Sequence, residues 1–229
     1  MPSQSKGTPP RAKYTVPSVK PFAQGHIGVG RPVSVVLSLL LAFSLSLCRA
    51  QDTHQDEADR LAVLLNWQPS STVADIGAGE GQMTLAAAKR VARVYTTELD
   101  PKMLAKLEQL AATDNHIIAL KAAETETNLP PECCDSIFMR FVYHHLTKPT
   151  EMDASLFRSL KPGGLLAVID EEPPAGSSRV EGVPENRGGH GMPQKILMEE
   201  LTSAGFQALK VLDDWPNKSY CVVLRRPAS

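Results

Sequence analysis

The sequence has little net charge and few aromatic residues, and each shortage excludes a class of partner. It contains 24 Lys and Arg against 25 Asp and Glu, so the formal net charge is -1 at pH 7. A chain this close to neutrality has no global field that attracts a polyanion. Trp67 and Trp215 have no basic stripe beside them, and we interpret both as core or rim residues and not as a base-stacking platform. No nucleic-acid partner is expected.

Cysteine is also scarce, and its positions match no common zinc site. The four cysteines, Cys48, Cys133, Cys134 and Cys221, form no C-x-x-C pair and no zinc-type Cys/His spacing. Neighbouring cysteines seldom meet the geometry of a structural disulfide, so small buried thiols are expected. The sequence therefore predicts no metal ligand set.

The sequence lacks an apolar run long enough to span a bilayer. The stretch 33–47 would extend roughly 22 Å as a helix, against a hydrocarbon core of about 30 Å. A basic, acid-free segment precedes it and Cys48-Arg49-Ala50 follows it, which is the order of a secretory signal peptide cleaved after Ala50. We expect a disordered leader with this signal-like segment at 1–50, a globular domain at 51–229, and export to the periplasm or beyond. A misplaced start codon would make the protein cytoplasmic instead.

From residue 56 onward, segments typical of helices and of strands alternate. Short apolar runs bounded by Gly, Pro or Asp indicate buried strands, and longer amphipathic stretches indicate helices. The expected strands are 72–76, 93–97, 117–120, 136–141, 165–169, 207–212 and 220–224; the expected helices are 56–66, 82–92, 101–112, 151–160 and 193–204, with a turn at 161–164. This alternation predicts an α/β fold with a mostly parallel sheet, whose ligands bind at the carboxyl ends of the strands.

A glycine loop follows the first expected strand, in the sequence VADIGAGEG at 73–81. Its glycines are Gly77, Gly79 and Gly81, and its acids are Asp75 and Glu80. A carboxylate near a pyrophosphate would cost on the order of 1 to 4 kcal/mol of Coulomb energy, whereas it would stabilise a cation. Glu98 ends the next strand, where an acid can accept hydrogen bonds from both ribose hydroxyls. The loop therefore predicts a positively charged nucleoside, and S-adenosyl-L-methionine fits this description.

Further motifs occur in a fixed order along the chain. They are DIGAGEG at 75–81, ELD at 98–100, NLP at 128–130, DSIF at 135–138, FVYHHL at 141–146 and LKPGG at 160–164. Over about residues 56–226 this series resembles the class I S-adenosylmethionine-dependent methyltransferases, in particular the type-11-like small-molecule branch. The resemblance implies a three-layer Rossmann-like α/β fold with a mostly parallel seven-stranded sheet and an antiparallel last strand. It implies an enzyme that transfers a methyl group from S-adenosyl-L-methionine to a small-molecule acceptor.

The resemblance also implies which residues bind the cofactor. Asp75, Gly77 and Gly79 would line its methionine part, and Glu98 would hold the ribose. The family often has an Asp at the adenine amine that is absent from Lys121-Ala122-Ala123-Glu124, so Glu124 is the candidate substitute. Arg140 falls at the pocket floor. The full expected cofactor set is Asp75, Gly77, Ala78, Gly79, Glu80, Gly81, Glu98, Leu99, Ala123, Glu124 and Arg140.

Candidate catalytic residues follow the fourth and fifth expected strands. His144 and His145 come after the fourth strand, Asp170 ends the fifth, and His190 lies in a later loop. Methyl transfer is an in-line displacement that needs positioning and, for some nucleophiles, one base. The histidine pair can equally shape the wall of the pocket. Two adjacent histidines are expected to face different ways and not to form a metal site.

The segment Pro173–Met192 is long, rich in glycine and poor in apolar residues. Loops of this length inside a compact domain usually bind or cover something. We expect a substrate lid in which Arg179, Arg187 and His190 offer contacts to an anion or a proton, and a disordered insertion is the alternative.

Two other functions fit parts of the sequence. An NAD(P)-dependent oxidoreductase would use the glycine loop for a dinucleotide, although the G-x-G-x-G spacing and Asp75 oppose it. A noncatalytic nucleoside-binding module on the same fold would account for the missing Asp in 121–124.

Overall fold

The structure, a computed structural model, describes residues 54–228. The signal-like segment expected at 1–50, with its cleavage point after Ala50, lies outside these residues, and export stays a prediction. Within 54–228, every helix is too short or too polar to cross a membrane.

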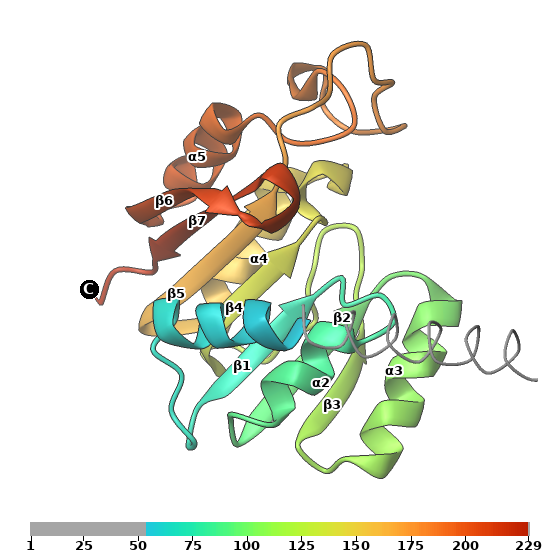
Figure 1. Cartoon of the computed structure of the whole chain (residues 1–229), viewed down its shortest axis with the longest axis vertical. Coiled ribbons are helices and arrows are strands. Elements are labelled where there is room, and N and C mark those ends of the chain that lie inside the picture. Colours follow the sequence, from blue (N-terminus) through green and yellow to red (C-terminus); the bar gives the residue numbers. More distant parts are fainter. Residues whose placement is uncertain (1–53, 229) are drawn as a thin grey trace, which may run out of the picture. The chain divides into compact units, whose positions relative to one another are not determined.

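One seven-stranded sheet forms the centre of the described part of the chain (Figure 1). Its strands are β1 (Thr72–Ile76), β2 (Arg93–Glu98), β3 (Ile117–Lys121), β4 (Cys134–Arg140), β5 (Leu160–Asp170), β6 (Gln207–Trp215) and β7 (Ser219–Arg225). They lie in the order β3-β2-β1-β4-β5-β7-β6. Strand β7 runs antiparallel to both of its neighbours, and the other pairings are parallel. The expected α/β fold with its antiparallel last strand is confirmed.

Helices cover both faces of the sheet. The first helix includes residues 54–64, and it is followed by α2 (Gln82–Ala88), α3 (Pro101–Thr113), α4 (Pro149–Ser159) and α5 (Gln194–Ser203). Helix α3 begins as its sequence predicts: the Asp100 carboxylate accepts hydrogen bonds from the backbone N–H groups of Lys102 and Met103, and proline occupies the first turn. In Figure 1 the first helix and α2 lie in front of the sheet and α4 lies behind it.

The core consists of two apolar clusters, one on each face of the sheet. Ile137 and Met139 of β4 pack in the cluster that contains Leu156 of α4, whereas Phe138 between them packs in the cluster of Trp67 and the α2 side chains. Successive side chains of a strand point to opposite faces, and here both faces are apolar. This double coverage explains why the central strands read as continuous apolar runs and not as alternating patterns.

Three local expectations differ from the structure. Residues 161–164, expected as a turn, belong to β5, where the pairing with β4 shifts register. Helix α2 ends at Ala88, earlier than its expected end at 92, because Lys89 caps it and a turn leads into β2. Cys133 and Cys134 are joined as a disulfide, so the expectation of free thiols is wrong for this pair, whereas Cys221 is a buried free thiol.

Candidate active site

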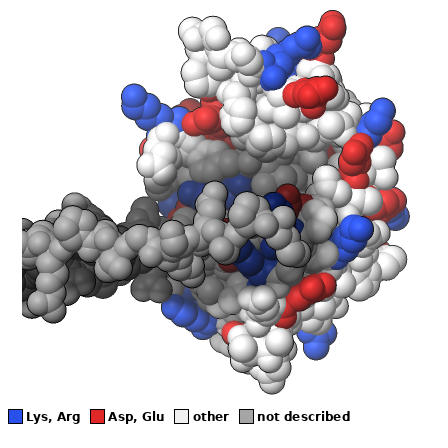
Figure 2. Space-filling view, turned by 90° about the vertical axis from the view of Figure 1, so that its right-hand side faces the viewer, with Lys and Arg blue, Asp and Glu red and all other residues white. Residues whose placement is uncertain are grey.

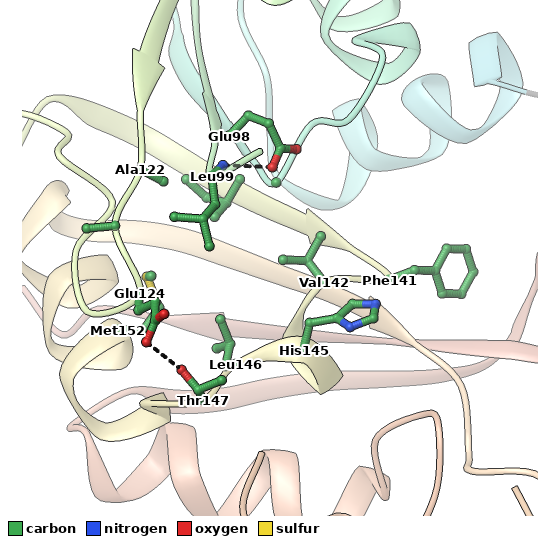
Figure 3. A pocket seen from close by; sticks show the side chains of 13 residues that line it. Glu98, Leu99, Ala122, Glu124, Phe141, Val142, His145, Leu146, Thr147 and Met152 are labelled. Atoms are coloured by element: carbon green, nitrogen blue, oxygen red, sulfur yellow. Dashed lines mark hydrogen bonds between the residues drawn. The ribbon is translucent and has the colours of Figure 1, made fainter. Parts of the chain in front are cut away.

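A cavity of about 380 Å³ lies where the carboxyl ends of β1, β2 and β4 meet (Figure 3). Five of the expected cofactor residues line it, namely Gly77, Glu98, Leu99, Ala123 and Glu124. The rest of the lining is Ile76, Ala122, Phe141, Val142, His145, Leu146, Thr147 and Met152. The location agrees with the general rule that ligands of open parallel sheets bind outside the carboxyl ends of the strands.

Gly77 brings the glycine loop against the segment that follows β4. Its φ is +68°, and a Cβ at this position would lie 2.7 Å from Val142 Cγ2. Its N–H donates to the backbone carbonyl of Thr97 at 2.9 Å, which holds the loop beside the end of β2. Both the positive φ and the close approach require glycine here.

Both carboxylate oxygens of Glu98 accept backbone hydrogen bonds, and one of these comes from the glycine loop. Oε2 accepts a hydrogen bond from the N–H of Gly79 at 2.9 Å, and Oε1 accepts from the N–H groups of Leu99 and Asp100 at 2.7 and 3.1 Å. A carboxylate has about four lone-pair sites, and three are occupied here, so Glu98 retains capacity for about one further donor, such as a hydroxyl group. These contacts fix the side chain at the edge of the cavity (Figure 3).

Asp75 lies beneath the loop and outside the cavity lining. Its side chain is only 2% exposed, and Oδ2 accepts a hydrogen bond from Thr84 Oγ1 at 2.7 Å. Burial raises the pKa of Asp75 to about 7, although the Thr84 hydrogen bond acts in the opposite direction. A cation bound near the loop would favour the ionised carboxylate.

The other expected cofactor residues also lie outside the lining. Ala78, Gly79 and Gly81 belong to the loop, where Gly81 forms the left-handed N-cap of α2. Glu80 forms an exposed ion pair with Lys106. Arg140, expected at the pocket floor, instead forms an ion pair with Glu57 of the first helix, with 2.8 Å between Nε and Oε2.

Glu124 is placed at the cavity by a hydrogen bond across it. Thr147 Oγ1 donates to Glu124 Oε2 at 3.2 Å, as Figure 3 shows. Thr147, Val142 and Leu146 line the cavity but were absent from the expected set. The motif FVYHHL contains two of these residues, so it could have identified them, whereas Met152 comes from α4 and depends on helix packing.

The three candidate catalytic histidines lie together beside the cavity. His144 and His145 belong to a short 3-10 turn, η1 (Tyr143–His145), and their ring centroids are 4.1 Å apart. The His190 ring lies 4.5 Å from that of His144 and 5.3 Å from that of His145. The expectation that the two adjacent histidines face different ways is therefore wrong, because the turn bends the chain so that their rings converge.

Asp170 holds the innermost histidine. His144 Nδ1 lies 2.8 Å from Asp170 Oδ1, and the His144 backbone N–H donates to Oδ2 at 3.2 Å. Both side chains are buried, with relative exposures of 3% and 0%. His144 Nε2 is buried and has no hydrogen-bond partner among residues 54–228. Since Nδ1 faces a carboxylate, the proton belongs on Nδ1 and the Nε2 lone pair is directed away from Asp170.

The segment Pro173–Met192 is ordered by an arginine within it. Arg187 lies in a 3-10 turn, η2 (Glu185–Arg187), is fully buried, and forms an ion pair with Glu200 of α5 at 2.9 Å. Its guanidinium also lies 5.3 Å from the centre of the Tyr143 ring. Arg187 is thus a structural anchor of the segment and offers no exposed contact to an anion, whereas His190 lies at the cavity side of the same segment.

Comparison with known proteins supports the fold and finds one matching family. Residues 74–168 match the methyltransferase-domain family Methyltransf_11. A comparison with curated proteins found no match. The match covers β1 to β5, including the glycine loop, Glu98, His144 and His145.

Solved structures with the same fold are similar over most of the chain. An S-adenosylmethionine-dependent methyltransferase from Aquifex aeolicus is 22% identical over 73% of this chain and 88% of its own, with a TM-score of 0.61. Geranyl diphosphate C-methyltransferase from Streptomyces coelicolor is 14% identical over 75% and 78%, with a TM-score of 0.60. The cyclase SpnF is 16% identical over 76% and 82%, with a TM-score of 0.63. Motifs, strand order and the family match agree: the chain has the fold of the class I S-adenosylmethionine-dependent methyltransferases, and its residues 74–168 match the methyltransferase-domain family.

Proposed function

We propose that the domain transfers the methyl group of S-adenosyl-L-methionine to a small-molecule acceptor that binds at the histidine side of the cavity. One observation carries this proposal: a single cavity is lined by Gly77 and Glu98 of the glycine-loop region and also by His145. Donor and acceptor could therefore occupy one space, as a direct transfer requires.

The lining suggests how the donor binds. Glu98 accepts a hydrogen bond from a ribose hydroxyl, and Glu124 accepts one from the adenine amine. Leu99, Ala122 and Leu146 present apolar surface to the adenine ring. The carboxylate of Asp75 lies below the loop, where it stabilises the positive charge of the methionine part.

The transfer itself is an in-line displacement. A lone pair of the acceptor forms a bond to the methyl carbon while the carbon–sulfur bond breaks, and its electrons remain on sulfur. The sulfonium becomes a neutral thioether, and S-adenosylhomocysteine leaves. The acceptor proton passes to a base or to solvent. The protein contributes mainly by holding the two reactants in line and excluding water.

A small acceptor agrees with the size and the charge of the site. The cavity of about 380 Å³ lies in the range of small-molecule pockets. Val142, Leu146 and Met152 give it an apolar wall. On the uncovered part of the face drawn in Figure 2, basic and acidic side chains are interspersed. The Streptomyces coelicolor relative, a geranyl diphosphate methyltransferase, also acts on a small molecule.

Neither alternative gains support from the structure. A dinucleotide pyrophosphate at the glycine loop would face the carboxylates of Asp75 and Glu98, and the family match is to methyltransferases. A purely binding role would leave the convergence of three histidines and Asp170 beside the cavity without a use.

Calorimetric titration of the full-length chain tests the donor. We expect S-adenosyl-L-methionine to bind in the micromolar range and NAD not to bind. For the acceptor, the enzyme is incubated with donor labelled on its methyl group and with a cell extract divided by size. Label in the small-molecule fraction is expected; label confined to the macromolecular fraction, or binding of NAD alone, would contradict the proposal.

A further inference from the structure

His144, His145 and His190 bring three imidazoles to one point although they come from two distant segments. One ring-nitrogen ligand atom from each histidine lies within 4.8 Å of the other two. We propose that these three histidines form a binding site for a divalent transition-metal ion of the zinc type, and that the ion holds the acceptor during methyl transfer. The metal site stands on its own geometry, and only its role in the reaction rests on the proposed function.

The distances are close to those of a metal site. Nitrogen ligands lie about 2.1 Å from zinc, so two of them in a tetrahedral site are about 3.4 Å apart. In the present structure the three ligand atoms lie within 4.8 Å of one another, so they need to approach by little more than 1 Å to bind one ion. His145 and His190 are exposed, and rotation of their rings can supply this movement without repacking the core.

His144 has the features of an inner metal ligand. Within the described part of the chain its buried Nε2 lacks a hydrogen-bond partner, a state that folded proteins rarely leave uncompensated. A metal ion would occupy that lone pair. On the other side of the ring, Asp170 accepts the Nδ1 hydrogen at 2.8 Å and so fixes the tautomer and the ring orientation. Metal-ligating histidines usually carry such a carboxylate partner.

The ligand type selects the class of ion. Imidazole ligands suit zinc, cobalt, nickel, copper and iron, whereas magnesium and calcium prefer oxygen. Three protein ligands leave the fourth position of a tetrahedral ion open, as in catalytic zinc sites.

That open position would serve the acceptor. His145 lines the cavity that we assign to the donor, so an ion held by it would lie at the acceptor side. A hydroxyl group bound to the ion would have a lowered pKa and would lose its proton to solvent. The resulting oxygen lone pair would form the bond to the methyl carbon as the carbon–sulfur bond breaks. The acceptor is then a small molecule with a hydroxyl or a similar oxygen donor.

Metal binding is measured on the full-length chain, purified without a polyhistidine tag and stripped with a chelator. The chain is dialysed against cobalt or zinc, and the bound metal is counted by mass spectrometry, with the visible absorption of cobalt reporting its coordination. We expect one ion per chain. We expect affinity at least tenfold weaker in His144→Ala and in His190→Ala, and unchanged in His116→Gln, which alters an exposed histidine away from the cluster.

The role of Asp170 is tested separately as a positioning residue. Asp170→Asn should weaken metal binding about 10- to 100-fold while the donor still binds, which also shows that the variant is folded. Less than stoichiometric metal on the wild-type chain, or full binding in His144→Ala, would overturn the inference. If the donor binds and no metal does, the proposed function stands and the His144–Asp170 pair is left as a general base.

Discussion

The guanidinium of Arg187 forms an ion pair with the Glu200 carboxylate at 2.9 Å, and the arginine side chain has no solvent exposure. Removing one partner of a buried pair leaves the other charge without compensation, so Arg187→Met should lower the free energy of unfolding by about 3 kcal/mol or more. The exposed ion pair Lys195–Glu199 on α5, the helix of Glu200, offers the control. Lys195→Met should change the free energy of unfolding by less than about 0.5 kcal/mol. Urea unfolding measures both, and equal effects would show that Arg187 is not an anchor.

Gly77→Ala should disturb the cavity through Val142. A side chain at positive φ costs about 1–2 kcal/mol by itself, and the added Cβ would also lie 2.7 Å from Val142 Cγ2. Gly163 has a similar positive φ with nothing within 4 Å, so Gly163→Ala measures the backbone cost alone. We expect a larger loss of stability in Gly77→Ala, together with weaker donor binding, and partial recovery in the double variant with Val142→Ala. Identical losses in the two alanine variants would exclude the contact as the cause.

Glu98→Gln should weaken donor binding and also lower stability, because the amide nitrogen would face at least one backbone N–H that the carboxylate now accepts. The amide keeps one oxygen acceptor but replaces the other with a donor. Glu98 therefore loses hydrogen bonds to its charged carboxylate, each worth roughly 1.5–3 kcal/mol. We expect the Kd for S-adenosyl-L-methionine to rise about tenfold or more. Glu126→Gln, which alters an exposed ion pair with Arg158, should leave the Kd unchanged. Calorimetry of both variants measures the Kd. An unaltered Kd in Glu98→Gln would show that Glu98 does not bind the ribose.

Asp75 should make the stability of the ligand-free protein depend on pH. Burial raises its folded-state pKa to about 7 from an ordinary value of 3.8, so the folded chain keeps a proton that the unfolded chain releases. The resulting contribution to the free energy of unfolding is fully present below pH 3.8 and is lost as the pH rises toward 7. Each pKa unit of difference corresponds to roughly 1.4 kcal/mol.

Comparison with Asp75→Asn isolates this effect. Burial also raises the pKa of Asp153 to about 7, so Asp153 lowers the stability of both the wild type and Asp75→Asn as the pH rises. Urea unfolding at pH 5 and pH 8 should therefore show a smaller decrease in stability for Asp75→Asn than for the wild type. Bound donor should reduce the wild-type decrease, because its cation favours the ionised carboxylate. Parallel pH profiles for the two proteins would show that Asp75 ionises normally.

The strands and the cofactor side of the site were predictable because their signals are local. A strand, a glycine loop and an acid at the end of the next strand lie within 72–98, and the parallel sheet brings them together at one edge. Gly77 and Glu98 therefore appear at the cavity as the sequence predicts.

The remaining features depend on packing between distant segments. Arg140 follows a strand that leads to the site, but the buried Glu57 of the first helix forms an ion pair with it. Arg187 reads as a loop residue free to bind an anion, yet Glu200 and the Tyr143 ring hold it in the interior. The position of His190 follows from this anchoring, and sequence spacing contains no information about it.

The stretch shared with the methyltransferase family ends at residue 168, two positions before Asp170. The glycine loop, Glu98, His144 and His145 lie within this stretch, whereas Asp170, Arg187 and His190 lie beyond it. Changes confined to residues 169–228 would therefore alter Asp170 and His190 while leaving the glycine loop, Glu98, His144 and His145 intact.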